Sequence, residues 1–198
     1  MVDRCRTVSV GCHVSRRLGE KEFVNEQNAI FWGTFEGFVW IRCEGKGSFL
    51  QSPALKECAQ QGEKHGRRRF VIDLEKCSGM DSTFMGTLAG LSTRMRRSGG
   101  DVQIASPGSK NRQSLEDLGL DHLLDIEPAD AEWRGHVDDI RSDLKSFSPN
   151  GPQGLGERAR HVLDAHRDLA STSDQNARRF KGVLDVLQKQ APPDEADK

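Results

Sequence analysis

The chain has 198 residues and a net charge of −1, with 35% hydrophobic and 30% charged residues. This length allows one domain with extensions or two small domains, and the composition is too apolar for a chain that is disordered throughout. The near-zero net charge gives no general attraction to nucleic acid or to an anionic membrane, and no apolar run is long enough to span a bilayer.

The first segment of the chain, residues 1–28, is polar, partly basic and without sustained periodicity. We expect it to be mobile, and it lacks the apolar centre of a secretory signal. The Cys12-His13 pair is half of a metal site at most, and no second pair follows at ligand spacing, so we expect no metal. The five cysteines are odd in number and irregularly spaced, which favours a reducing compartment and predicts a cytoplasmic protein.

Order is expected to begin near Ala29 with a β-hairpin. The runs Ile30–Phe35 and Phe38–Cys43 are rich in aromatic and β-branched residues and flank Glu36-Gly37. Glycine reaches the positive φ angles of tight turns, so this pattern is typical of two strands joined by a turn. Ser52-Pro53 then predicts the start of a helix, with the serine as cap and the proline at the first helical position.

The next part of the chain alternates between strand and helix patterns. Phe70–Leu74 is a short apolar run typical of a strand that is covered on both faces. Helical periodicity begins at Ser82 and ends at Gly99-Gly100, after basic residues that favour the negative end of a helix. The elements expected after this helix are a strand at Val102–Ala105, a helix from Ser109 to Gly119 and a short strand at Leu123–Ile126.

The order of these elements predicts an α/β domain at residues 29–128. Strands that are joined through helices form right-handed crossovers, so we expect a small mixed sheet that is largely parallel after the N-terminal hairpin, with helices packed on it. About a hundred residues suffice to bury a core of their own. Residues 129–198 are expected to form a helical extension whose last residues are disordered.

The extension carries apolar residues at helical spacing on both sides of a Pro- and Gly-rich segment at 148–152. At this spacing the apolar residues form one helix face, which must be covered by the α/β domain, by a second helix of the extension or by another chain. The sequence leaves these alternatives open. The candidates for a helix face that binds a partner or forms a homodimer are Trp133, Val137, Ile140, Leu144, Phe147, Phe180, Leu184 and Leu187.

The α/β part resembles the STAS family, the domain of bacterial anti-sigma-factor antagonists. The resemblance is carried by the strand Phe70–Leu74, the segment Gly79–Thr83 that opens a helix, the helix end at Arg96–Gly100, the following strand from Asp101, and Ser114–Asp121, which is similar to the family's third helix. It covers roughly residues 29–128. It implies a STAS fold and a function in regulated protein binding, without enzymatic activity.

In that family, the serine directly after the aspartate at this helix start is phosphorylated by an anti-sigma factor that is an ATP-dependent serine kinase. The resemblance implies Ser82 as the acceptor and Thr83 as a second candidate. The unphosphorylated chain would bind the kinase and release a sigma factor, and a phosphatase would restore this state. ATP and Mg²⁺ would belong to the partner, and no cofactor is expected in the chain. The expected neighbours of the switch site are Asp73, Asp81, Phe84 and Gly86.

Phe84 departs from the family pattern, which has glycine directly after the two hydroxyl residues. Its ring either buries in the core or crowds the surface where a kinase approaches. A phosphate on Ser82 would add about −1.5 to −2 charges, which the amides and dipole of a helix start tolerate. We therefore expect the phosphate to weaken an interface packed over Ser82 and to leave the fold intact.

Two other functions stay open. Asp and Ser are ordinary cap residues, so Ser82 would be only a cap in a STAS scaffold that oligomerises or binds a partner through its C-terminal helices. A small-ligand sensor or lipid-handling module is also compatible with the fold. Motifs for a nucleophile elbow, a phosphate-binding loop and a zinc protease are missing, and His161 and His166, five residues apart, do not share a helix face for a metal.

Overall fold

The computed structural model describes residues 28–149 and 154–190. The predicted mobile segment before Asn28, with its Cys12-His13 pair, and the predicted disordered C-terminal residues lie outside these ranges. Within the described ranges, no helix is both long enough and apolar enough to cross a membrane.

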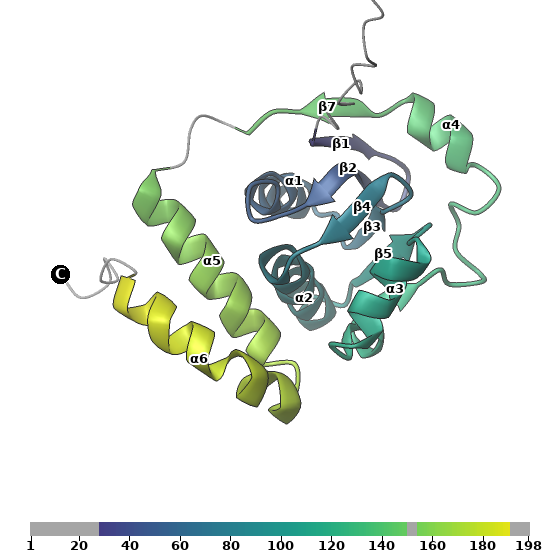
Figure 1. The fold of residues 1–198 in the computed structure, drawn as a ribbon. Coiled ribbons are helices and arrows are strands. Elements are labelled where there is room, and N and C mark those ends of the chain that lie inside the picture. Colours follow the sequence, from purple (N-terminus) through teal and green to yellow (C-terminus); the bar gives the residue numbers. More distant parts are fainter. Residues whose placement is uncertain (1–27, 150–153, 191–198) are drawn as a thin grey trace, which may run out of the picture.

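The structure is built on one mixed sheet, which confirms the predicted α/β class (Figure 1). Its strands are β1 (Ala29–Thr34), β2 (Val39–Gly47), β3 (Arg69–Asp73), β4 (Cys77–Met80), β5 (Asp101–Ala105), β6 (Asp125–Ile126) and β7 (Lys145–Phe147). The strand order is β6-β5-β3-β2-β1-β7, and β4 pairs with β2 beside this row. The strands β2, β3, β5 and β6 are parallel, whereas β1 is antiparallel to both β2 and β7.

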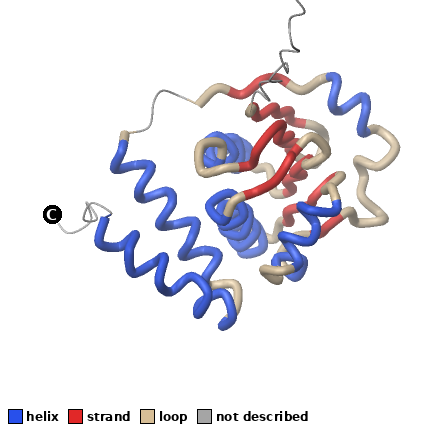
Figure 2. The backbone as a smooth tube through the Cα atoms, in the orientation of Figure 1, coloured by secondary structure: helices blue, strands red, loops and turns tan. Residues whose placement is uncertain are grey.

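Helices lie on both sides of the sheet, most of them on one face (Figures 1 and 2). They are α1 (Ser52–Lys64), α2 (Ser82–Arg97), α3 (Ser109–Glu116), α4 (Val137–Ser142), α5 (Leu155–Ala170) and α6 (Asp174–Gln190), with a short 3₁₀ helix at Leu120–His122. The main core lies between the sheet and α1, α2 and α3. Helix α5 packs on α2, and α6 packs on α5 (Figure 1).

Alternate residues of β2 enter two different cores, because successive side chains of a strand point to opposite faces. Val39 and Ile41 join the main core, whereas Trp40 joins a second cluster with Trp133 and Ile140. The rings of Trp40 and Trp133 meet edge to face with their centroids 5.4 Å apart. The start of the extension therefore covers the second face of the sheet.

The prediction of a helix running from Trp133 to Phe147 is wrong. Only Val137–Ser142 forms a helix, Leu144 lies in a loop, and Phe147 lies in β7 opposite Ile30 of β1. The apolar spacing suggested one helix, but Trp133 reaches the second cluster from a turn and Ile140 reaches it from the short helix. The first half of the extension thus contains only the short helix Val137–Ser142, and the long helices lie in its second half.

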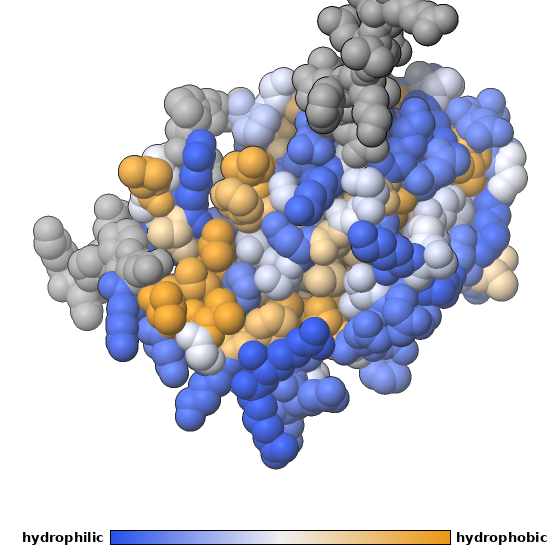
Figure 3. Space-filling model, in the orientation of Figure 1, coloured by the Kyte–Doolittle hydropathy of each residue, from blue (hydrophilic) through white to orange (hydrophobic). Residues whose placement is uncertain are grey.

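That second half is covered by the chain itself. Leu169 of α5 and Phe180 of α6 are buried and belong to the main core, while Leu184 and Leu187 are half-buried. Figure 3 shows apolar surface on the side of the molecule where these two helices lie. The large apolar side chains that stay exposed are Phe49, Leu50, Leu155, Val183 and Val186.

Strand β4 was not predicted, because its sequence Cys-Ser-Gly-Met has no apolar alternation. It forms because β2 is longer than β3. The first residues of β2 pair with β3, and Gly45–Gly47 pair in parallel with β4, with a register shift between Gly45 and Lys46. This pairing brings the start of α2 to the end of β2.

Two leucines of α5 test whether this helix is part of the core. Leu169 is 0% exposed and Leu155 is 86% exposed. Leu169→Ala should lower the free energy of unfolding by about 2–5 kcal/mol, because it removes buried methyl groups and leaves a cavity. Leu155→Ala should change it by less than about 0.5 kcal/mol. Urea denaturation measures both, and equal effects would mean that α5 is not docked as described.

Candidate functional site

The start of α2 is capped by Asp81. The Asp81 Oδ1 atom accepts a hydrogen bond from the amide of Phe84 at 2.9 Å, and its Oδ2 atom accepts one from the amide of Phe49 at 2.8 Å. Ser82 is the first helical residue. The interpretation of Ser82 as the cap is therefore wrong, because Asp81 fills that role and joins α2 to the loop after β2.

The Ser82 hydroxyl contacts the extension. Its Oγ atom lies 3.0 Å from Nε2 of His166 in α5. The other ring nitrogen of His166 lies 2.8 Å from the carbonyl oxygen of Val162, which can only accept. In the neutral ring Nδ1 therefore carries the proton, and Ser82 donates its hydroxyl proton to Nε2. Ser82 is half-buried beneath α5 as a result.

Two glycines let α5 come close to α2. A Cβ atom on Gly86 would overlap the backbone of Ala165, and one on Gly90 would overlap the carboxylate of Asp168. Glycine lets two helix backbones approach because it carries no side chain. The resemblance placed Gly86 beside the switch site, and in the structure this residue forms the contact with α5.

The two residues after Ser82 are buried. Thr83 is 5% exposed and Phe84 is 0% exposed, and the Phe84 ring belongs to the main core. The sequence left open whether the Phe84 ring is buried or crowds the surface. In the structure the Phe84 ring is buried and does not crowd the surface. Thr83 remains a prediction as a second acceptor, and its burial makes it less accessible than Ser82.

A second histidine of α5 contacts the start of α1 in the same way. The Nε2 atom of His161 lies 2.8 Å from Oγ of Ser52. Ser52 was predicted as a cap, but the cap position belongs to Gln51, and Ser52 is the first helical residue. The five-residue spacing from His161 to His166 directs the two rings to different sides of α5, so each ring contacts a different helix. Sequence reasoning missed both contacts, because the pairs are 109 and 84 positions apart.

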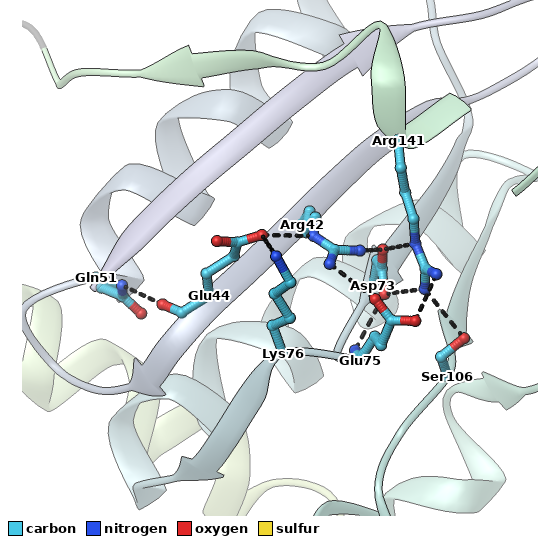
Figure 4. A network of polar contacts seen from close by, with 8 residues as sticks. All are labelled: Arg42, Glu44, Gln51, Asp73, Glu75, Lys76, Ser106 and Arg141. Atoms are coloured by element: carbon cyan, nitrogen blue, oxygen red, sulfur yellow. Dashed lines mark hydrogen bonds and ion pairs between the residues drawn. The ribbon is translucent and has the colours of Figure 1, made fainter. Parts of the chain in front are cut away.

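Asp73 lies in an ion-pair cluster (Figure 4). Its carboxylate is fully buried and binds Arg42 at 2.6 Å and Arg141 of α4 at 2.8 Å. Glu75 contacts both arginines from the exposed side. Burial opposes the charge of Arg42, but its hydrogen bonds to carboxylates raise its pKa overall. Asp73 as a neighbour of the switch site stays a prediction, and its hydrogen bonds within the described residues join α4 to β2 and β3.

A family comparison identifies the fold. The sequence model of the STAS domain matches residues 34–132, which is half of the chain. The chain therefore belongs to the STAS family, as the resemblance had indicated. The match ends near Trp133, so α4, β7, α5 and α6 lie beyond it.

Solved structures with a similar fold are described as anti-sigma factor antagonists. One from Thermotoga maritima has a TM-score of 0.47 at 17% identity, over 56% of this chain and 92% of its own. SpoIIAA in its unphosphorylated form has 0.45 at 18%, over 57% and 98%. One from Mycobacterium paratuberculosis has 0.48 at 18%, over 60% and 95%. No curated protein sequence is significantly similar to the chain.

The ion-pair cluster predicts that the carboxylates of Asp73 and Glu75 contribute differently to the stability of the fold. Asp73→Ala should lower the free energy of unfolding by about 3–5 kcal/mol, because it leaves the buried guanidinium of Arg42 without its closest partner. Glu75→Ala should cost less than about 1 kcal/mol, since the Glu75 side chain is 45% exposed. Urea denaturation of both variants provides the test, and an equal loss would contradict the assigned role of Asp73.

The docking of α5 should depend on pH through His161. Burial, with the positive charge of Lys56, lowers the pKa of His161 from 6.5 to about 4. Arg94, Asp164 and Asp168 also line the small cavity beside this ring. Between these pH values the unfolded chain binds the proton and the folded chain does not, so the stability that comes from neutral His161 falls as the pH drops below 6.5.

This contribution should fall by about 2 kcal/mol between pH 7 and pH 4.5. His161→Gln should therefore lose less stability than the wild type over this interval, as measured by urea denaturation at both pH values. His65→Gln, which changes an exposed histidine, is the matched control and should behave like the wild type. Identical pH dependence of wild type and His161→Gln would contradict the burial of a neutral ring.

Proposed function

We propose that the chain is an anti-sigma-factor antagonist that binds an anti-sigma serine kinase and is inactivated by phosphorylation of Ser82. The proposal rests on membership of the STAS family and on the position of Ser82 at the start of α2. The observation that carries it is that Asp81, and not Ser82, caps the helix. The Ser82 hydroxyl is thus not needed to form the helix and can take part in chemistry.

The local structure suits a switch that changes a surface and not a fold. Phe84 anchors the first turn of α2 in the core, and Asp81 holds the same turn to the loop at Phe49. A phosphate on Ser82 would lie at the positive end of the helix dipole, which stabilises negative charge. It would add bulk and charge to any protein surface packed over Ser82.

In this function the chain contributes the acceptor hydroxyl and the partner contributes the chemistry. The kinase supplies ATP and Mg²⁺ and transfers the terminal phosphoryl group to Oγ of Ser82, while the hydroxyl proton leaves. A phosphatase reverses the modification. The unphosphorylated chain sequesters the kinase and so releases a sigma factor in the cytoplasm. We assign no catalytic residue to the chain.

Mass spectrometry after incubation with ATP and the anti-sigma kinase of the same genome should find one phosphate on Ser82. Ser82→Ala should abolish it, whereas Ser78→Ala, which changes an exposed serine of the adjacent strand, should not. Ser82→Asp should weaken kinase binding about a hundredfold, equivalent to about 3 kcal/mol, and Ser82→Ala should preserve binding. An unmodified Ser82, with equal binding by both variants, would leave the STAS scaffold as the better function.

A further inference from the structure

The surface assigned to the kinase is covered by the chain's own extension. His166 contacts the Ser82 hydroxyl, and Ala165 lies against Gly86 one turn further along α2. A kinase must reach Oγ of Ser82 with its own catalytic groups, and α5 fills that space. The proposed modification therefore requires α5 to leave the start of α2.

A phosphate on Ser82 is also poorly accommodated beneath α5. The Ser82 oxygen and Nε2 of His166 are 3.0 Å apart, which leaves no room for a phosphorus atom and its oxygens between them. The modified oxygen no longer has a proton to donate, so the hydrogen bond from Ser82 to Nε2 of His166 is lost. At Gly86 and Gly90 the helix α5 already contacts α2 closely, so α5 cannot move closer to α2 there to make room for the phosphate.

We propose that docking of the α5–α6 pair and occupancy of Ser82, by phosphate or by a partner, are mutually exclusive. The pair is then an intramolecular competitor for the partner surface of α2, and phosphorylation opens the chain. This inference rests on the proposed function of Ser82. It adds a specific element that must move, residues 155–190, and a direction for the movement.

The α5–α6 pair contacts the domain through both apolar and polar groups. The main core is formed mostly by the sheet, α1, α2 and α3, and the pair adds Leu169 and Phe180. The remaining contact includes the Ser82–His166 and Ser52–His161 bonds and the close approach of Ala165 to Gly86. Burial in this contact raises the pKa of Asp168 and lowers that of His161, so docking disfavours the charged form of each.

Hydrogen exchange on the full-length chain tests the opening without any partner. Ser82→Asp places a carboxylate against His166, and Ser82→Ala removes the hydroxyl without adding bulk. We expect amides of residues 155–190 to exchange at least tenfold faster in Ser82→Asp than in Ser82→Ala, while β3 and β5 stay protected. Equal protection of α5 in the two variants would overturn the inference. So would slower exchange in Ser82→Asp, as expected if protonated His166 pairs with the new charge.

A disulfide between α2 and α5 tests the competition directly. A Cβ atom on Gly90 would lie 3.4 Å from Cβ of Asp168, close to the separation found in disulfides. The double variant Gly90→Cys, Asp168→Cys should thus lock α5 in place when oxidised. With the kinase that modifies the wild type, phosphorylation of Ser82 should be at least tenfold slower in the oxidised variant, and dithiothreitol should restore it. Asp168→Cys alone, which leaves Gly90 in place, is the control.

The two experiments separate the failure of the inference from the failure of the proposed function. Equal phosphorylation of the oxidised and reduced double variant would overturn the competition and leave Ser82 as the acceptor. If the kinase does not modify even the wild type, the proposed function fails. Hydrogen exchange in Ser82→Asp then still decides whether a charge at Ser82 expels α5.

Discussion

The close contact of α5 with α2 is the constraint on which the surroundings of Ser82 depend. It depends on glycine at two positions of α2, since a Cβ atom on Gly86 would overlap the backbone of Ala165 and one on Gly90 would overlap the carboxylate of Asp168. Because the backbones approach so closely, the ring of His166 reaches the Ser82 hydroxyl. The same helix brings His161 to Ser52 at the start of α1. Two histidines of α5 therefore hold the polar groups at two helix starts of the STAS domain.

The residues beyond the STAS domain divide into two parts with different physical roles. The first part completes the domain, because Trp133 and Ile140 close the second face of the sheet and Arg141 neutralises the buried Asp73. Removing this part would expose Trp40 and leave a buried carboxylate short of a partner. The second part, α5 and α6, lies on the helical side and contacts the site. It is the part that can change its position at the smaller cost to the core.

The fold could be predicted well where the pattern was local. The hairpin, the strand β3 and the helix that begins at Ser82 were all indicated by apolar periodicity and turn residues, and the family resemblance placed Ser82 at the helix start. Strand β4 and the true course of residues 133–147 could not be predicted, because both are stabilised by strands distant in sequence. The role of His166 had no local signal either, since it depends on a contact across 84 positions.

The short strand β7 has a further consequence for how the molecule meets others. It pairs with Ile30–Trp32 of β1 and carries the exposed Lys145, so it covers that edge of the sheet. The opposite edge, β6, has only two residues and is followed by Pro128. Short, charged or proline-flanked edges discourage the addition of a foreign strand. Recognition by this protein is therefore expected to use helix surfaces, and self-association through an extended intermolecular sheet is disfavoured by the fold.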